Sequence, residues 1–257
     1  MDLDFTDKRV LITGASTGIG AAIAKKFLEE GAKVIIVSRG SKKLFENQKN
    51  LQEEFGKQKI FAESCDCTSS KSLLALANII QDKWNGIDIV IANVGDGRSV
   101  PDPLPNDEQW TKTWNNNFES ALYTARIFLP MLQKSKGCLL FISSIAAMEA
   151  FGAPVDYSTA KTAIVALAKN MARKLAKEVR VNVLAPGNVF FAGGSWDEKI
   201  KHDPQKVEDI IKSTVPMNRF GTPNEMADAA LFLCSGRAAF ITGSVLVVDG
   251  GQTVGVF

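Results

Sequence analysis

The stretch Lys8-Arg-Val-Leu-Ile-Thr-Gly14-Ala-Ser-Thr-Gly18-Ile-Gly20 decides the fold of this 257-residue chain. Its apolar run favours a buried strand and stops at a glycine cluster, after which a helical pattern runs to a C-cap glycine, Gly31. Glycines let a ligand approach the backbone closely, and the start of a helix offers unpaired N–H groups and a positive dipole end. The pattern therefore predicts a site for the diphosphate of a dinucleotide, although its spacing, G-x-x-x-G-x-G, differs from the commoner G-x-G-x-x-G.

Strand-like and helix-like segments alternate along the whole chain, which is typical of a doubly wound parallel sheet with right-handed crossovers. The strand segments are continuous apolar runs, as expected where helices cover both faces of a sheet. Neither a repeat nor a linker interrupts the pattern, so we expect one α/β domain, 1–257, with a Rossmann fold of about seven strands. The expected strands are 8–13, 33–38, 59–66, 87–92, 137–143, 179–184 and 244–248, and the later helices are 41–56, 69–84, 107–134, 155–177 and 223–235.

Composition and charge exclude several classes of function. The chain is 46% apolar and 23% charged with a net charge of +2, so it lacks the electrostatic footprint of a nucleic-acid or membrane-surface binder. No apolar run reaches the roughly 18 residues of a membrane span, and the acidic N-terminus does not resemble a signal peptide. The two cysteines of Cys65-Asp-Cys67 are closer in sequence than those of the usual Cys-x-x-Cys metal-binding pair, so we expect structural thiols and no metal site. Reduced thiols in turn favour a cytoplasmic location.

Two segments are longer than the roughly two to six residues of usual connections. They are 95–109, which contains three prolines, and 188–222, which contains the only histidine, His202, expected on the surface. Loops at the carboxyl ends of parallel strands bind ligands, so we expect both to contact the substrate. The segment Gly187–Trp196, at the start of the second loop, is predicted to be a lid with glycine hinges. For Arg98, in the first loop, two roles stay open: it contacts an anionic substrate, or it is simply exposed to solvent.

The stretch Ser143–Lys161 carries the side chains that suggest chemistry. Tyr157 and Lys161 are four positions apart and share one face of a predicted helix, and Ser143 and Ser144 end an apolar run thirteen to fourteen residues before the tyrosine. A free tyrosine titrates near ~10, and a neighbouring ammonium lowers that pKa by stabilising the phenolate, which makes Tyr157 a candidate acid/base. A Tyr–Lys pair also occurs on helix surfaces, so its meaning depends on the serines and the glycine turn.

The end of the second predicted strand distinguishes between the two nicotinamide dinucleotides. An acidic residue there bonds the ribose 2′-hydroxyl of NAD, whereas an arginine accommodates the 2′-phosphate of NADP. This chain has Ser38 and then Arg39, with Lys42 and Lys43 close behind and no carboxylate to repel a phosphate. We therefore expect a preference for NADP(H), with Arg39 as a bidentate contact and NAD(H) possible as an alternative.

Several further motifs fall at set places in the alternating pattern. They are Asp66 after the third strand, Ala92-Asn93-Val94-Gly95 after the fourth, Asn117 in WNNNFESAL and Pro186-Gly187 after the sixth. Together with the glycine turn and the Tyr-x-x-x-Lys pair, they resemble the short-chain dehydrogenase/reductase family over essentially the whole chain, in particular its 3-oxoacyl-reductase-like members. The resemblance implies an NAD(P)-dependent oxidoreductase that interconverts a ketone and a secondary alcohol.

The resemblance also implies a role for each site residue. Tyr157 would be the general acid/base, Lys161 would also bond the nicotinamide ribose, and Ser144 would orient the substrate oxygen. Asn117 would hold a water of the proton relay, and Ser143 is less favoured than Ser144, which has the family's thirteen-residue spacing to the tyrosine. The implied cofactor contacts, besides Tyr157 and Lys161, are Gly14, Ser16, Thr17, Gly18, Ile19, Gly20, Ser38, Arg39, Asp66, Cys67, Asn93, Gly95, Pro186, Gly187 and Val189.

The chain departs from the family pattern in two places. Ala92 and Val94 replace residues of the family's Asn-Asn-Ala-Gly element, and Phe191 stands where the family often has a threonine that contacts the nicotinamide carboxamide. In place of that threonine, we expect Ser195 or the backbone at Val189 to contact the carboxamide. The substrate stays open among a 3-oxoacyl thioester, a keto-sugar or sugar nucleotide and a small hydroxy acid. The family implies a homo-oligomer, a tetramer or dimer, and the alternative from another class is a dinucleotide-sensing regulator.

Overall fold

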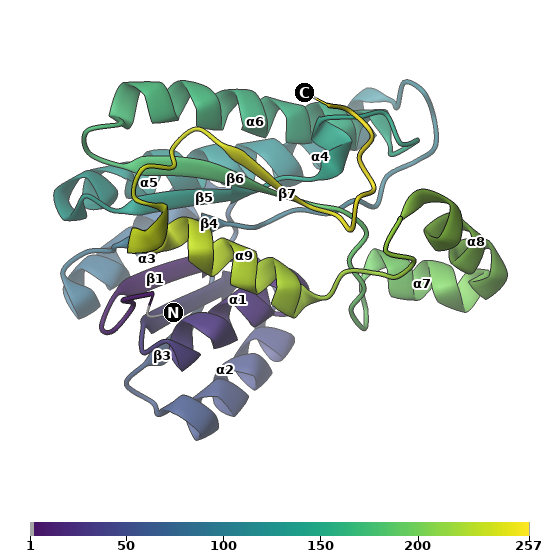
Figure 1. Cartoon of the computed structure of the whole chain (residues 1–257). Coiled ribbons are helices and arrows are strands. Elements are labelled where there is room, and N and C mark those ends of the chain that lie inside the picture. The colour runs from purple at the N-terminus through teal and green to yellow at the C-terminus, as the bar shows by residue number, and fades with distance from the viewer. Residues whose placement is uncertain (1–2, 257) are drawn as a thin grey trace.

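The computed structural model describes residues 3–256, and its centre is one sheet of seven parallel strands in the order β3-β2-β1-β4-β5-β6-β7 (Figure 1). The strand order reverses between β1 and β4, which confirms the predicted doubly wound Rossmann fold. The strands are β1 (Arg9–Thr13), β2 (Lys33–Ser38), β3 (Ile60–Ser64), β4 (Ile89–Ala92), β5 (Cys138–Ile142), β6 (Arg180–Pro186) and β7 (Val245–Val248).

Helices cover both faces of the sheet, and each face has its own hydrophobic core. Successive side chains of a strand point to opposite faces, so Ile12 of β1 joins one core with Phe27, whereas its neighbour Leu11 joins the other with Phe128. This two-sided burial is the reason that the strands are apolar throughout. The helices are α1 (Gly18–Glu29), α2 (Ser41–Phe55), α3 (Ser70–Trp84), α4 (Asp107–Trp114), α5 (Ser120–Ser135), α6 (Val155–Leu175), α7 (Ser195–His202), α8 (Pro204–Thr214) and α9 (Pro223–Cys234).

The segment 188–222 is more ordered than the sequence pattern predicts. It contains α7 and α8, which lie to one side of the sheet in Figure 1. Helix α7 is short and buries none of its residues, so it lacks the apolar periodicity by which helices are recognised. Helix α8 does carry a signal: Asp203 accepts a hydrogen bond from the Lys206 N–H, and Pro204 follows at the first helical position.

The predicted helix 107–134 is divided into three segments. Between α4 and α5 lies a π-helix, η1 (Asn115–Glu119), whose wider turn is closed by a hydrogen bond from the Ser120 N–H to the Asn115 carbonyl. Propensity patterns assume 3.6 residues per turn and do not reveal such a change. Within residues 3–256, no helix is long and apolar enough to cross a membrane.

Candidate active site

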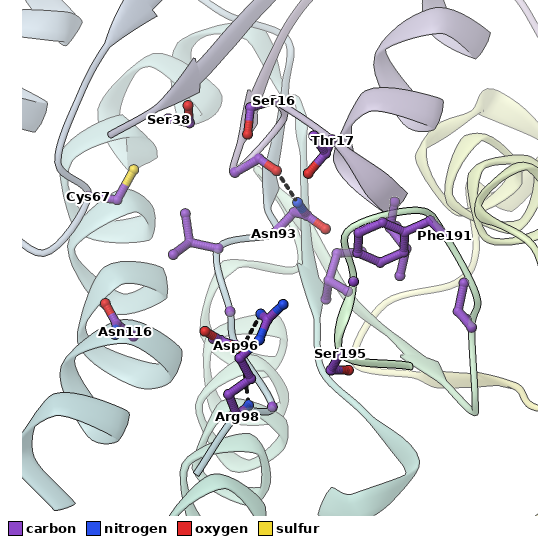
Figure 2. Close-up of a pocket in the computed structure, with 18 of the residues that line it drawn as sticks. Ser16, Thr17, Ser38, Cys67, Asn93, Asp96, Arg98, Asn116, Phe191 and Ser195 are labelled. Carbon is purple, nitrogen blue, oxygen red and sulfur yellow. Dashed lines mark hydrogen bonds and ion pairs between the residues drawn. The ribbon is translucent and has the colours of Figure 1, made fainter. Parts of the chain in front are cut away.

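A cavity of about 480 Å³ opens where the carboxyl ends of the strands meet, and Figure 2 shows several of the side chains around it. Its place at the reversal of strand order is where open α/β sheets bind ligands. The structure brings most of the predicted site residues to its wall: Gly14, Ser16, Thr17, Ile19, Ser38, Arg39, Asp66, Cys67, Asn93, Gly95, Tyr157, Lys161, Pro186, Gly187 and Val189. Gly18, Gly20, Asn117 and Ser144 lie next to this wall without lining it.

The glycine turn is held against β4 by the side chain of Asn93. Its amide donates hydrogen bonds to the carbonyl oxygens of Thr13 (2.9 Å) and Gly14 (3.1 Å), as Figure 2 shows for one of them. A Cβ atom on Gly20 would lie 2.5 Å from the same Asn93 nitrogen and 2.7 Å from the Gly14 carbonyl oxygen. Close packing therefore requires glycine at position 20. The Asn93 side chain holds the turn in place through its two hydrogen bonds.

Helix α1 begins without a side-chain cap. The side chain of its N-cap residue, Thr17, accepts no capping hydrogen bond, and the first turn contains no acidic residue. By contrast, Ser69, Asn106 and Thr222 cap α3, α4 and α9 with their side chains. The first N–H groups of α1 and its positive dipole end are thus left for an anion. This uncapped end, next to a glycine cradle, fits the diphosphate of a dinucleotide.

The ring of Phe191 lies against the same turn. A Cβ on Gly18 would be 2.8 Å from this ring, and one on Gly194 would be 2.9 Å from it. Gly18 also has a φ of +62°, a conformation that favours glycine. Phe191 therefore connects the glycine turn to the loop before α7, a contact that the sequence did not indicate.

Arg39 and Asp66 line the cavity just beyond the ends of β2 and β3. Arg39 is exposed at the cavity, and no carboxylate of the described residues pairs with its guanidinium. Ser38 bonds the Gly40 carbonyl (3.0 Å) and does not compete for this arginine. The Asp66 carboxylate accepts hydrogen bonds from the N–H (3.0 Å) and hydroxyl (2.8 Å) of Thr68, a local turn that leaves its other oxygen unbonded among residues 3–256.

Tyr157 and Lys161 project from the first turns of α6. The Lys161 amino group is buried, donates a hydrogen bond to the Ile142 carbonyl (3.1 Å) and lies 5.8 Å from the centre of the Tyr157 ring. Burial lowers the pKa of Lys161 to about 8. Burial also raises the pKa of Tyr157; a hydrogen bond with the Ser144 hydroxyl partly offsets this rise, and the charge of Asp96 adds to it.

The raised pKa of Tyr157 contradicts one expectation from the sequence. The sequence predicts that the Lys161 ammonium lowers the pKa of Tyr157, but in this structure burial outweighs any such effect and the phenol keeps its proton. The structure also separates the two serines. Ser144 begins a 3₁₀ turn by accepting a hydrogen bond from the Ala146 N–H (3.1 Å), whereas the Ser143 hydroxyl donates to the Lys161 carbonyl (2.9 Å) and is buried.

Asn117 is buried within the π-helix, and its side chain is fully engaged. Its amide oxygen accepts from the Asp96 N–H (3.0 Å), and its two amide hydrogens bond the carbonyls of Asp96 (3.1 Å) and Thr113 (3.0 Å). Asn117 thereby fixes the turn at Gly95, where a Cβ would lie 2.8 Å from the Lys161 nitrogen. The water contact that resemblance implies for this residue stays a prediction, and its amide hydrogens are not free to make it.

Arg98 connects the two loops that the sequence assigns to the substrate. Its guanidinium forms two hydrogen bonds with the Glu198 carboxylate (2.8 and 2.7 Å) and a third with Asp96 (3.1 Å). Its side chain is exposed, which agrees with the solvated role, and its charge is compensated by the two carboxylates; contact with an anionic substrate stays a prediction. The sequence does not indicate Glu198 as the partner of Arg98. The two residues are 100 positions apart, and α7 has no apolar periodicity that would predict a helix there.

Comparison with known proteins connects this site to established enzymes. The family model described as Enoyl-(Acyl carrier protein) reductase matches residues 14–253. The 3-oxoacyl-[acyl-carrier-protein] reductase FabG of Chlamydia trachomatis is 32% identical over 96% of this chain and 97% of its own length. L-sorbose reductase from Gluconobacter frateurii, solved with NADPH and L-sorbose, superposes with a TM-score of 0.92 at 29% identity, over 100% of both chains.

A third relative carries the other dinucleotide. A 7α-hydroxysteroid dehydrogenase solved with NADH and a 7-oxo bile acid has a TM-score of 0.88 at 30% identity, covering 99% of this chain and 98% of that one. The family match extends over nearly the whole chain, and the fold and cavity agree with it. The chain therefore belongs to the short-chain dehydrogenase/reductase family of NAD(P)-dependent oxidoreductases.

Proposed function

We propose that this protein is an NADP(H)-dependent reductase that converts a ketone into a secondary alcohol, with Tyr157 as the proton donor. The observation that carries the proposal is the place of Tyr157, which lines the cavity together with Lys161, four positions further along α6. The phenol and the nearby Ser144 hydroxyl each have one hydrogen, and both can be donated to the oxygen of a bound ketone.

The raised pKa of Tyr157 supports the direction of reduction. A protein that reduces a ketone must deliver a proton to its oxygen, and a phenol that stays protonated at neutral pH is ready to do so. A bound nicotinamide dinucleotide supplies the hydride. Ser144 holds the substrate oxygen against the phenol, and Lys161, with a pKa of about 8, supplies positive charge at neutral pH where negative charge develops on Tyr157.

The preference for NADP(H) rests on Arg39. Its guanidinium is exposed at the cavity without a carboxylate partner among the described residues, which suits bidentate contact with a 2′-phosphate. The solved relatives include one with NADPH and one with NADH, so relatedness alone does not choose between them.

The substrate that the cavity suits best is a small, uncharged ketone with polar groups. Arg98, which lines the cavity, is paired with Glu198 and Asp96, so it offers no free charge to a phosphate or carboxylate. Polar side chains at the cavity, among them Asp96, Asn116 and Ser195 in Figure 2, offer hydrogen bonds to hydroxyl groups. This favours a keto-sugar over a hydroxy acid or an acyl-carrier thioester.

The test is NADPH oxidation with a panel of neutral keto-sugars, keto acids and 3-oxoacyl thioesters. We expect turnover with a neutral ketone, loss of at least about a thousandfold in kcat for Tyr157→Phe, and unchanged NADPH affinity in that variant. Arg39→Ala should weaken NADPH binding about tenfold and leave NADH binding unchanged. Tight NADPH binding without turnover on any carbonyl would instead indicate the dinucleotide-sensing regulator.

A further inference from the structure

Asp156 is a buried carboxylate that the proposed chemistry does not use. It directly precedes Tyr157 in the chain and is only 1% exposed. Within residues 3–256, no lysine or arginine forms an ion pair with it. An unpaired buried charge is costly unless hydrogen bonds compensate it, so the neutral donors around this carboxylate are essential to its presence there.

The first of these donors is the backbone of the catalytic tyrosine. One oxygen of Asp156 accepts the Tyr157 N–H at 2.8 Å. This bond fills a gap, because the N-cap residue of α6 is Pro154, whose side chain provides no cap. A carboxylate in the first turn also interacts favourably with the helix dipole. Asp156 therefore fixes the backbone from which the phenol projects.

The other oxygen reaches the substrate loop. It accepts a hydrogen bond of 2.5 Å from the Ser99 hydroxyl, whose oxygen in turn accepts one from the Gln109 amide (3.1 Å). The same amide of Gln109 donates to the Thr113 hydroxyl (2.9 Å) on α4. Ser99 lies one residue beyond Arg98, which lines the cavity. One carboxylate thus joins the start of α6, the loop 95–106 and the start of α4.

The hydrogen bonds also fix the charge state of this carboxylate. Burial alone raises the pKa of Asp156, but hydrogen bonds from Ser99, Thr113 and the Tyr157 backbone outweigh it and hold the pKa below its usual value. At neutral pH the group is an anion that acts only as an acceptor, so it can accept from the Tyr157 N–H and the Ser99 hydroxyl at once.

We infer that Asp156 is a positioning residue for the proton transfer: by binding the Tyr157 N–H and the Ser99 hydroxyl, it sets the distance between the phenol and the substrate loop. This inference rests on the proposed function, since it assigns the phenol to the carbonyl oxygen. A misplacement of reacting groups by about 1 Å can cost about a hundredfold in rate, so a brace at this point has a measurable effect.

Two substitutions separate the contacts. Asp156→Asn keeps an oxygen for the Tyr157 N–H but presents an amide to the Ser99 hydroxyl, whose hydrogen then loses its acceptor. Ser99→Ala leaves the Tyr157 N–H bond in place but removes the loop contact, together with the acceptor of the Gln109 amide, and Ser99→Thr restores the hydroxyl. Asp102→Asn is the matched control, because Asp102 lies on the same loop but only accepts the Leu104 N–H (3.0 Å).

Steady-state kinetics with NADPH and a reactive ketone would measure the effect on catalysis. We expect Asp156→Asn to lower kcat about tenfold to a hundredfold and to shift the pH profile of kcat, and Ser99→Ala to raise KM about fivefold. Ser99→Thr and Asp102→Asn should behave as the wild type, and NADPH affinity should be unchanged in all four variants. Unchanged kinetics in both Asp156→Asn and Ser99→Ala, or a loss that only follows a lowered Tm with an unchanged pH profile, would overturn the inference.

Amide hydrogen exchange of residues 96–106 provides a readout without turnover. We expect exchange there to rise about tenfold in Asp156→Asn and Ser99→Ala and to stay unchanged in Asp102→Asn. If the wild type reduces no ketone and the exchange still rises, the proposed function fails while the brace stands. If the wild type is active and the exchange does not change, the brace itself is refuted.

Discussion

On the proposed cofactor side of the cavity, part of the wall is backbone: the glycine turn, the uncapped start of α1 and the carbonyls that Asn93 binds. On the substrate side it consists of side chains that meet across long sequence distances, as Arg98 and Glu198 do over 100 residues. Where closely packed backbone forms the wall, even one added Cβ atom clashes, and the shape of the wall is set by the local sequence. Side-chain sites depend on how distant loops fold, and their exposed ion pairs are individually weak. The two sides should therefore respond very differently to small substitutions.

Gly20→Ala tests the cofactor side and should have the largest effect. Alanine has a higher helix propensity than glycine by about 1 kcal/mol, so any loss must come from the new Cβ, which would lie 2.5 Å from the Asn93 nitrogen. We expect the Kd for NADPH to rise at least about a hundredfold, close to 3 kcal/mol, by isothermal titration calorimetry. Gly236→Ala, where a Cβ meets nothing within 4 Å, is the control. A Kd within about threefold of wild type for Gly20→Ala would contradict this account of the turn.

Lys161→Met tests the point where the two sides meet. Because burial lowers the pKa of Lys161 to about 8, the protonated amine destabilises the fold at neutral pH. We expect the variant to lose activity yet to gain about 2 kcal/mol in the free energy of unfolding, measured with urea at pH 7.

The pH dependence of this gain has a definite sign. The unfolded chain binds the proton more tightly than the folded protein, so the penalty is complete below pH 8 and is relieved as the pH rises toward 10.5. The difference between Lys161→Met and the wild type should therefore shrink above pH 8. A difference that is constant between pH 7 and pH 10 would show that the penalty does not arise from titration of this amine.

Arg98→Ala tests the substrate side and should have the smallest effect on stability. Its pair with Glu198 is solvent-exposed, so the free energy of unfolding should change by no more than about 0.5 kcal/mol. We expect KM for the ketone to rise about threefold to tenfold because the two loops are no longer joined. Lys25→Ala, which removes a similar exposed pair with Glu54 between α1 and α2, away from both loops, is the control for KM. Equal KM values in the two variants would mean that the cross-loop pair does not shape the substrate space.

The same comparison explains what the sequence could predict. The alternation of strands and helices, the turn at Gly14 and the grouping of Tyr157 with Lys161 follow from local patterns, because a helix or a tight turn fixes neighbouring residues in space. The partner of Arg98 and the ring of Phe191 against Gly18 do not follow, because they depend on the path of a 35-residue segment, 188–222, that has little periodicity. Asp156 is intermediate: its place beside Tyr157 is evident in the chain, but its contact with Ser99 spans 57 residues.

The π-helix between α4 and α5 has a consequence for insertions and deletions. Each residue of an α-helix turns the chain by about 100°, and a π-turn holds one extra residue. The wider π-turn takes up the rotation of that extra residue, so deleting one residue of Asn115–Glu119 would restore an ordinary turn and leave α5 in its present register with α4. The apolar stripe with Phe128 and Leu132 would stay on the sheet, whereas Asn117 or its neighbours would leave Asp96. The extra residue therefore serves the active site and not the core, so its loss should damage the site while the fold is kept.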